Sequence, residues 1–331
     1  MTSIFSPRIL IIRRDNIGDL VCTLPFIRRL RQHYPQAWIG ALVTSYTVEV
    51  LRANPDLNAV FYYTKTKHLT TNESTLKTIL YRLRLLWQLR QKKIDIVLLP
   101  ATGTQTSSRW MAKLIGAKRI LTQHDAPNTP MALHEVDRTA NLLRALDIPQ
   151  TQLPPPQIYP RTDLLAEVQA QFSTSSSVLG LHISARKPSQ RWPTDRFIEL
   201  IQRLNAQSPE LHIALFWSPG TSDNPLHPGD DTKAQEIIAA CASCSITPIP
   251  APSLAELIAG LAVCSKIICS DGGHMHLAAA LNKPIVCLFG KSDTIRWPPW
   301  RVPYQLIQPE SLDVCDVSVD RVLSAFSCLP D

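Results

Sequence analysis

Long hydrophobic runs are absent from this sequence of 331 residues. A membrane-spanning helix needs roughly 18–20 consecutive apolar residues, so no such helix is expected. Charged residues are also sparse, at 18%, while apolar residues reach 45%. This balance excludes a disordered chain and a simple charged coiled coil. Residues 1–12 have neither a charged n-region nor a small-residue cleavage site after their apolar run, so we expect no secretory signal and a cytoplasmic protein.

Cysteine and glycine are present but form no cofactor or metal motif. The eight cysteines follow no disulfide framework and predict free thiols. The pair Cys241 and Cys244 lacks the second pair that a zinc site would need. Only Gly18 stands in the loop where a dinucleotide-binding protein carries Gly-x-Gly-x-x-Gly. A nicotinamide cofactor is therefore not expected, and no other cofactor is indicated.

Charge is divided unevenly along the chain. Residues 1–160 hold 21 Lys and Arg against 10 Asp and Glu, a balance of +11, whereas residues 161–331 hold 13 against 17, a balance of −4. The basic half indicates either an ordinary solvated face or a surface that meets an anionic partner. Few aromatic residues are interleaved with the basic ones, so nucleic acid is not an expected partner; a nucleic-acid binder would show steeply salt-dependent binding.

Strand and helix patterns alternate along the chain, which predicts an α/β fold with parallel sheets. At roughly 150 residues per domain, the length allows two domains. The segment 148–160 contains five prolines and cannot hold regular structure, so we expect the interdomain linker there. We therefore expect two Rossmann-like, doubly wound domains, 1–160 and 161–331, that face each other across a cleft. The predicted strands are 8–13, 37–43, 59–63, 94–99, 178–183, 211–217, 266–269 and 285–289, and the predicted helices are 20–33, 47–53, 76–91, 111–115, 137–146, 194–205, 231–241, 253–264, 274–281 and 317–326.

The loops that follow strands are the candidate sites, because ligands of such sheets bind beyond the carboxyl ends of the strands. The first such loop is Arg14–Asp19. Asp19 falls at the start of a helix, where a carboxylate caps free N–H groups. The same carboxylate could instead act as a general base at the edge of a cleft. The sequence leaves both interpretations open.

A second loop again joins a strand to a helix. Its two glycines, Gly272 and Gly273, allow backbone N–H groups to approach a ligand, and the helix start that follows favours phosphate. Asp271 could accept hydrogen bonds from sugar hydroxyls; the alternative is a tight turn without a ligand. His274 and His276 have His-x-His spacing, but no third ligand is near them in the sequence, so we expect no metal.

A third loop holds three cations, Arg186, Lys187 and Arg191, beside the hydroxyl of Ser184. That combination suits a diphosphate whose charge is neutralised without a metal. An ordinary solvated basic loop is the alternative. A fourth loop, Gly290–Asp293, also follows a strand and could line the same cleft.

Residues 82–93 form a basic amphipathic helix. The favoured interpretation is an ordinary packed helix with a solvated outer face. The alternative is a patch that meets a membrane surface or acidic lipid headgroups. Lys65 and Lys67 would add to such a patch.

Three blocks of the sequence, taken together, carry a family resemblance. The first, 8–25, reads RILIIRRDNIGDLVCTLP, and the second, 270–290, reads SDGGHMHLAAALNKPIVCLFG. The third is Arg191-Trp-Pro193. In this order the blocks resemble the N-terminal signature, the donor-site motif and a further block of glycosyltransferase family nine, the ADP-heptose:lipopolysaccharide heptosyltransferases. The resemblance covers nearly the whole chain.

The resemblance implies a GT-B fold in which 1–160 binds the acceptor and 161–331 binds the nucleotide-sugar donor. It implies inverting, metal-independent transfer of a heptose from ADP-heptose to a lipopolysaccharide inner-core acceptor, Kdo or heptose, by a protein held peripherally at the cytoplasmic face of the inner membrane. The basic first half suits such an anionic acceptor. Asp19 would be the general base that takes the proton from the acceptor hydroxyl. The donor positions would be Ser184, Arg186, Lys187, Arg191, Asp271, Gly272, Gly273 and His276, and the acceptor positions Gly18, Lys65 and Lys67.

The sequence departs from the family pattern at two donor positions. Gln190 stands where the family usually has Lys, and Gly272 stands where it usually has Thr. The segment 216–230 also lacks the family's usual Gly-rich turn with a Glu, for which Asp223 could substitute. Two alternatives therefore stay open: a related transferase that uses another nucleotide sugar, and a non-catalytic relative that binds a sugar nucleotide.

Overall fold

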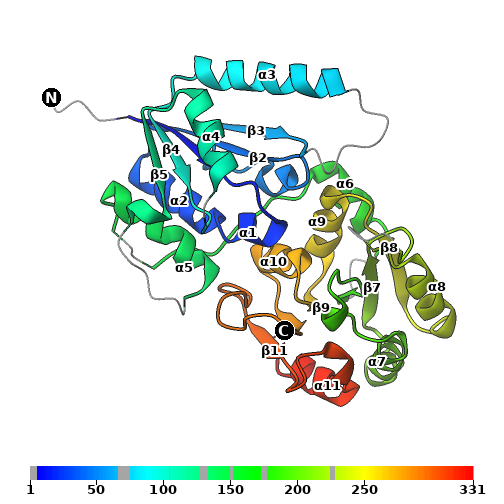
Figure 1. The fold of residues 1–331 in the computed structure, drawn as a ribbon. Coiled ribbons are helices and arrows are strands. Elements are labelled where there is room, and N and C mark those ends of the chain that lie inside the picture. The colour runs from blue at the N-terminus through cyan, green and yellow to red at the C-terminus, as the bar shows by residue number, and fades with distance from the viewer. Residues whose placement is uncertain are drawn as a thin grey trace. The chain divides into compact units, whose positions relative to one another are not determined.

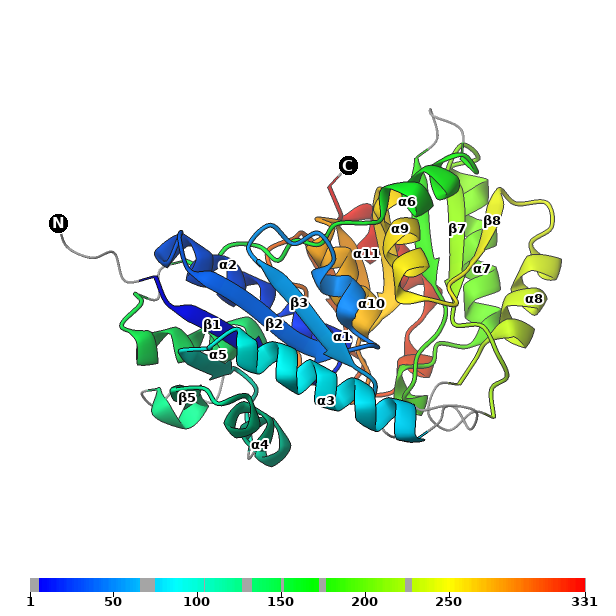
Figure 2. The same cartoon turned by 90° about the horizontal axis from the view of Figure 1, so that it is seen from above.

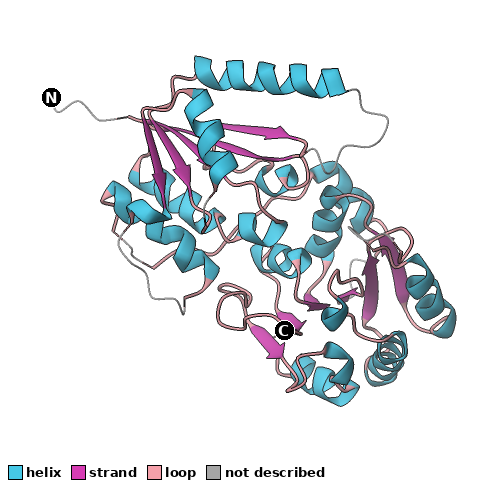
Figure 3. Ribbon diagram, viewed as in Figure 1, coloured by secondary structure: helices cyan, strands magenta, loops and turns pink. Residues whose placement is uncertain are grey.

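The computed structural model describes residues 6–65, 75–103, 105–126, 133–149, 152–172, 177–223 and 228–330. The chain forms two compact units, Met1–Gln157 and Ile158–Asp331 (Figure 1), and the division falls inside the proline-rich segment 148–160. Each unit is an α/β sandwich with one sheet between two layers of helices (Figure 3). None of the helices in the described ranges is long and apolar enough to cross a membrane.

The first unit is built on a parallel sheet of five strands in the order β3-β2-β1-β4-β5. The central strand β1 is a continuous apolar run, which is typical of a parallel strand covered on both faces. Its Leu10 pairs with Gly40 on one side and with Val97 on the other. The strands are β1 (Arg8–Ile12), β2 (Trp38–Thr44), β3 (Ala59–Tyr63), β4 (Ile96–Leu99) and β5 (Arg119–Thr122).

Helices cover both faces of the first sheet (Figure 2). The helices α3 (Thr75–Gln91) and α4 (Thr106–Ile115) share one apolar core with the strands, to which they contribute Leu85, Leu89 and Ala112. On the other face α2 packs against α5. The remaining helices of this unit are α1 (Ile17–Val21), α2 (Leu24–His33), α5 (Glu135–Ala140) and the 3-10 helices Val48–Leu51, Gln123–Asp125 and Asn141–Leu146.

The second unit repeats this architecture with six parallel strands in the order β11-β10-β9-β6-β7-β8. The helices α7, α8 and α11 cover one face and share a large apolar core, whereas α6, α9 and α10 pack together on the other. The strands are β6 (Val178–His182), β7 (His212–Trp217), β8 (Ile246–Pro250), β9 (Lys266–Ser270), β10 (Ile285–Leu288) and β11 (Tyr304–Ile307). The helices are α6 (Thr162–Gln169), α7 (Thr194–Gln207), α8 (Asp231–Ala240), α9 (Leu254–Val263), α10 (Gly273–Ala280), α11 (Val319–Ser327) and the 3-10 helices Pro188–Gln190 and Val314–Asp316.

Each sheet has one point where the strand order reverses. In the first unit this point lies between β1 and β4, and in the second between β6 and β9. The connections from these strands leave in opposite directions, and ligands of doubly wound sheets bind at such a point, beyond the carboxyl ends of the strands. The loops that follow β1, β6 and β9 are the ones that the sequence marks as candidate sites. The topology of each unit therefore favours the same loops.

Several predicted elements need correction. The helix predicted for 20–33 begins at Ile17 and is interrupted after Val21, so that α1 and α2 are separate. The helix predicted for 47–53 is a 3-10 helix, and the one predicted for 137–146 begins at Glu135 and continues as a 3-10 helix from Asn141. The strands β5, β8 and β11 and the helix α6 were not predicted.

Candidate active site

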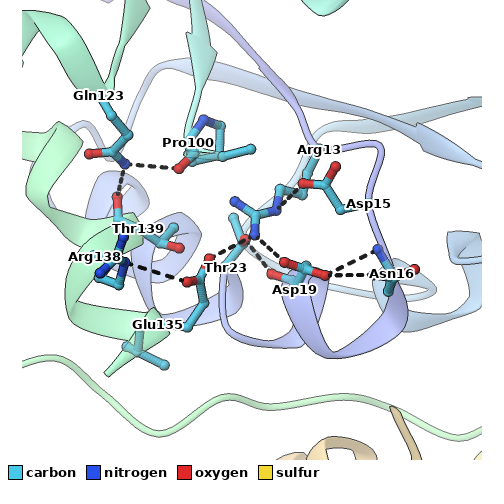
Figure 4. A network of polar contacts seen from close by, with 12 residues as sticks. Arg13, Asp15, Asn16, Asp19, Thr23, Pro100, Gln123, Glu135, Arg138 and Thr139 are labelled. Atoms are coloured by element: carbon cyan, nitrogen blue, oxygen red, sulfur yellow. Dashed lines mark hydrogen bonds and ion pairs between the residues drawn. The ribbon is translucent and has the colours of Figure 1, made fainter. Parts of the chain in front are cut away.

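The loop after β1 begins with a buried cation, Arg13, which is only 1% exposed (Figure 4). Its Nη2 lies 2.9 Å from Oδ1 of Asp19 and 3.0 Å from Oε1 of Glu135, and its Nε lies 3.1 Å from Oδ2 of Asp15. Burial alone lowers the pKa of the Arg13 guanidinium, but the three carboxylates outweigh this effect and hold its pKa above the ordinary value. Arg13 therefore stays positively charged and holds the carboxylates of Asp15, Asp19 and Glu135 around its guanidinium group.

Asp19 lies in the first turn of α1 and caps the start of that helix. Its Oδ2 accepts hydrogen bonds from the backbone N–H of Asn16 at 3.3 Å and from the side-chain amide of Asn16 at 3.2 Å. The capping interpretation is therefore confirmed. The side chain nevertheless stays 17% exposed, and each carboxylate oxygen can accept more than one hydrogen bond. Capping and contact with a substrate hydroxyl are thus compatible, because the cap and Arg13 fix the carboxylate without covering it.

Glu135 is a member of this network that sequence reasoning missed, as it missed the central role of Arg13. It comes from the first turn of α5, more than a hundred residues after Arg13, and its side chain is 2% exposed. Its other oxygen lies 3.8 Å from Nε of Arg138. Gln123 ties the same helix to the end of β4, since its amide donates to the carbonyl oxygens of Pro100 and Thr139 (Figure 4). Nothing in the local sequence distinguishes Glu135 from an ordinary acid at a helix start.

The three positions proposed for the acceptor have different surroundings. Gly18 is buried within α1, and its carbonyl accepts a hydrogen bond from the N–H of Cys22. Lys65 is half-buried and acts on Asp15: burial raises the pKa of the Asp15 carboxyl, and the charges of Arg13 and Lys65 oppose this rise. Lys67 lies outside the described residues. Lys65 therefore belongs to the surroundings of the Arg13 network.

In the second unit, Asp271 directly follows β9 and is held by two neutral donors. Its Oδ2 accepts from Nε2 of Gln190 at 2.7 Å and from Oγ of Ser292 at 2.6 Å. The same Gln190 nitrogen lies 2.9 Å from Oγ of Ser292, so the three side chains form a closed triangle. Gln190 is only 4% exposed. The residue that replaces the expected Lys therefore fixes Asp271 by hydrogen bonds rather than by charge.

The loop that carries Ser292 approaches the loop that carries Gln190 very closely. A Cβ atom on Gly290 would lie 2.1 Å from the carbonyl oxygen of Ser189, a distance that no side chain tolerates. Glycine is required here by space. The fourth loop predicted from the sequence, 290–293, thus contacts the third loop at Ser189 and the second loop at Asp271, all within the second unit.

Gly272, at the start of α10, faces the ring of His274. A Cβ atom on Gly272 would lie 2.6 Å from Cε1 of that ring. The ring is fixed in two ways, because it stacks on His182 with centroids 3.8 Å apart and its Nε2 lies 2.8 Å from the carbonyl oxygen of Ser270. Burial lowers the pKa of both histidines, so the stack is neutral at pH 7. A Thr side chain at position 272 would therefore meet this stacked ring.

Replacing Gly272 with Thr is expected to lower the free energy of unfolding by about 1–3 kcal/mol, because the new side chain must displace a packed ring. Urea denaturation measures this loss. The double variant Gly272→Thr/His274→Ala removes the obstructing ring and should regain much of the stability. A Gly272→Thr variant as stable as the wild type would show that the stack yields freely.

The two histidines of the His-x-His motif face different neighbours. His274 stacks on His182, whereas the buried ring of His276 packs edge-on against Trp297 with centroids 6.0 Å apart. Within the described ranges no group of three or more His, Cys, Asp or Glu side chains is arranged to hold a metal ion. The two rings are thus separate packing groups in this structure.

The third loop distributes its cations unequally. Arg186 and Lys187 are exposed, but Arg191 is paired with the buried carboxylate of Asp230. Ser184 is buried, and its Oγ accepts a hydrogen bond from the backbone N–H of Ser218 at 2.9 Å. Arg186 and Lys187 are therefore open to solvent, whereas Arg191 anchors the loop through Asp230.

Lys233 is a further cation that contacts this loop, and sequence reasoning missed it. It lies on α8, and its Nζ donates to the carbonyl oxygens of Trp192 at 2.6 Å and Ile183 at 3.3 Å. Burial lowers the pKa of this ammonium to about 8, although Asp230 opposes the shift. Lys233 therefore fixes the backbone at both ends of the loop, at Ile183 and at Trp192. Its position in an ordinary helical stretch gave no signal in the sequence.

Comparison with known proteins agrees with this architecture. A family model described as glycosyltransferase family 9 (heptosyltransferase) matches residues 82–315, which includes the second and third loops. Lipopolysaccharide heptosyltransferase 3 of Escherichia coli K12 is 25% identical over 309 residues, which span 86% of this chain and 82% of the relative.

Solved structures of heptosyltransferases share the fold. A glycosyltransferase of family 9 from Veillonella parvula superposes with a TM-score of 0.78 at 18% identity and covers 97% of this chain and 96% of its own. An E. coli heptosyltransferase solved with ADP superposes with a TM-score of 0.77 at 17% identity, over 97% of this chain and 99% of its own. The same enzyme with ADP-2-deoxy-2-fluoro heptose gives a TM-score of 0.72.

These similarities confirm two predictions made from the sequence. The α/β fold with two doubly wound units is the GT-B fold of the heptosyltransferases. The family model covers well over half of the chain. The protein belongs to glycosyltransferase family 9, the heptosyltransferases, and is a glycosyltransferase.

Proposed function

We propose that this protein transfers a heptose from ADP-heptose to an inner-core sugar of lipopolysaccharide, either Kdo or heptose. The family assignment supports heptose transfer. The donor is inferred from the E. coli heptosyltransferase whose structures hold ADP and an ADP-heptose analogue, and the acceptor from the name of the E. coli relative. We assign residues 1–160 to the acceptor and 161–331 to the donor.

The observation that carries the mechanism is the partly exposed Asp19 carboxylate, fixed by Arg13 and Asn16 at the point where the first sheet reverses its strand order. In the proposed step the acceptor hydroxyl attacks the anomeric carbon of the donor. The new C–O bond forms as the bond to the diphosphate breaks, and ADP leaves. Asp19 takes the hydroxyl proton, and attack from the face opposite the leaving group inverts the anomeric configuration.

We assign the donor to the loops of the second unit. Asp271 would accept hydrogen bonds from sugar hydroxyls, since Gln190 and Ser292 both donate to one of its oxygens and orient the other. The N-terminus of α10, with Gly272 and Gly273, favours phosphate, and the exposed Arg186 and Lys187 would neutralise the diphosphate without a metal. Ser184, Arg191 and His276 are then part of the frame around the donor.

We also propose that the protein works in the cytoplasm and attaches peripherally to the inner face of the inner membrane. The acceptor that we infer is the core of a lipid-anchored molecule, and its acidic sugars and phosphates suit the basic first unit, in which Lys and Arg exceed Asp and Glu by 21 to 10 over residues 1–160. Nucleic acid is not part of this proposal.

A nucleotide panel tests the donor assignment. ADP and ADP-heptose are expected to raise the melting temperature by several degrees at concentrations about a hundredfold above their Kd, because a ligand that binds only the folded state stabilises it by about 2.7 kcal/mol there. UDP, GDP and CMP serve as matched controls. Stabilisation by one of these instead of ADP would replace the donor, and no response to any nucleotide would contradict the assignment.

A further inference from the structure

The outer surfaces of α3 and α4 expose an unusual number of large apolar side chains. Trp87 on α3 is 62% exposed and Trp110 on α4 is 63% exposed. Twelve large apolar side chains are exposed within the described ranges, and these two helices hold seven of them. The seven are Ile79, Leu80, Tyr81, Leu83, Trp87, Trp110 and Leu114.

Except for Tyr81, whose hydroxyl donates to the carbonyl oxygen of Tyr62, these side chains lie opposite the faces that the helices bury. Leu85 and Leu89 turn α3 toward the core of the first sheet, while Ile79, Leu83 and Trp87, spaced four residues apart, form an exposed row. A helix that packs on a sheet ordinarily presents polar residues to water. The packed helix with a solvated outer face that the sequence favoured is therefore present, but that exposed face carries large apolar side chains such as Leu83 and Trp87.

A groove with apolar walls lies between α3 and α4 on the same face. Its volume is about 690 Å³, and its walls include Leu86 on α3 and Met111 and Leu114 on α4. Arg82 lines the groove and also donates to the carbonyl oxygen of Thr64. The groove thus combines apolar walls with a cationic group.

The charge of this face has a single sign. Neither α3 nor α4 contains an Asp or Glu, while together they carry Arg82, Arg84, Arg90, Arg109 and Lys113. Two copies of this chain could not pair through this face without bringing these cations against each other. An anionic surface is the complementary partner.

We propose that the α3–α4 face docks on an anionic lipid bilayer, with Trp87 and Trp110 at the headgroup level and the basic side chains against the phosphates. Tryptophan is enriched at membrane–water interfaces because its ring is amphipathic. Basic residues near an anionic leaflet add electrostatic attraction. This inference assigns a surface to the membrane contact proposed above. It rests on the proposed function only for the identity of the lipid-anchored acceptor.

Sedimentation with vesicles tests the docking surface. The wild type is expected to bind vesicles of phosphatidylcholine mixed with phosphatidylglycerol, to bind pure phosphatidylcholine weakly, and to dissociate as salt rises. Trp87→Ala/Trp110→Ala and Arg84→Glu/Lys113→Glu should each lower the partition coefficient about tenfold or more. Thermal melting checks that each variant is folded.

Matched controls come from exposed residues of the second unit. Ile295→Ala/Tyr304→Ala and Arg321→Glu should leave vesicle binding unchanged. Failure of the wild type to bind anionic vesicles would overturn the inference, as would equal losses in the control variants or retention on acidic peptide or DNA in place of vesicles.

Transfer to an acyl-free core oligosaccharide separates docking from the proposed function. The docking variants should keep wild-type turnover with this acceptor, which needs no bilayer. Loss of vesicle binding with turnover intact supports the surface assignment. Vesicle binding by a wild type that transfers no heptose would remove the proposed function and leave the docking surface standing.

Discussion

Asp19→Asn is expected to lower kcat for heptose transfer by about 10²–10⁴-fold, the usual contribution of a positioned general base. The amide keeps the size of the carboxylate but cannot take the acceptor proton. Donor binding should change little, because Asp19 belongs to the first unit and the donor is assigned to the second. Release of ADP under saturating acceptor measures kcat, and calorimetric titration with ADP measures donor binding.

Asp15→Asn is the matched control for this prediction. Asp15 pairs with the same Arg13, at 3.1 Å, but it lies outside α1 and is not assigned to the reaction. Its turnover should stay within a few-fold of the wild type. Wild-type turnover in Asp19→Asn would show that another group takes the proton, and equal losses in both variants would show that the network acts only as a scaffold.

Arg13→Met is expected to lower the free energy of unfolding by about 3–5 kcal/mol, the effect of removing one partner of a buried ion pair. The loss arises mainly from Glu135, whose side chain is 2% exposed and would lose its closest cationic partner. Urea denaturation followed by circular dichroism measures it.

Two further variants give this stability prediction its controls. Arg13→Met/Glu135→Gln also removes the buried carboxylate that has lost its closest cation, and should recover a substantial part of the stability. The exposed pair Arg52 and Glu49 has close contacts of 2.5 and 2.6 Å but lies at the surface, so Arg52→Met should cost only about 0–1 kcal/mol. If Arg13→Met lost no more stability than Arg52→Met, this result would contradict the role given to Arg13.

The strands that the sequence did not predict share a physical cause. The strands β5, β8 and β11 all lie at sheet edges. An edge strand is covered less completely than a central one, so its sequence need not be a continuous apolar run; β8 even contains Pro248 and Pro250, which only an edge tolerates readily. The central strands, fully covered on both faces, were all predicted because burial imposes an apolar run on them.

The sequence predicts those site residues that lie in loops directly after strands. It does not predict their contacts with residues that are distant in the sequence. Asp19 and Asp271 follow strands, and the rule for doubly wound sheets selects the loops in which they lie. The partners Glu135 and Lys233 come from helices, and only the fold brings them to these loops. Ser292 lies in the fourth loop that the sequence marks, but its contact with Asp271 was not predicted. The reason for Gly272 was hidden in the same way, because His182 fixes the ring that excludes a larger side chain.

Acceptor-dependent release of ADP from ADP-heptose tests the proposed reaction most directly. The purified protein is incubated with ADP-heptose, with and without truncated lipopolysaccharide that exposes its inner-core sugars, and both ADP and incorporated heptose are quantified. We expect one ADP for each heptose transferred, only when acceptor is present, and a product of inverted anomeric configuration. ADP-heptose that binds but remains intact with every inner-core acceptor would contradict heptose transfer and identify a sugar-nucleotide-binding protein without catalysis.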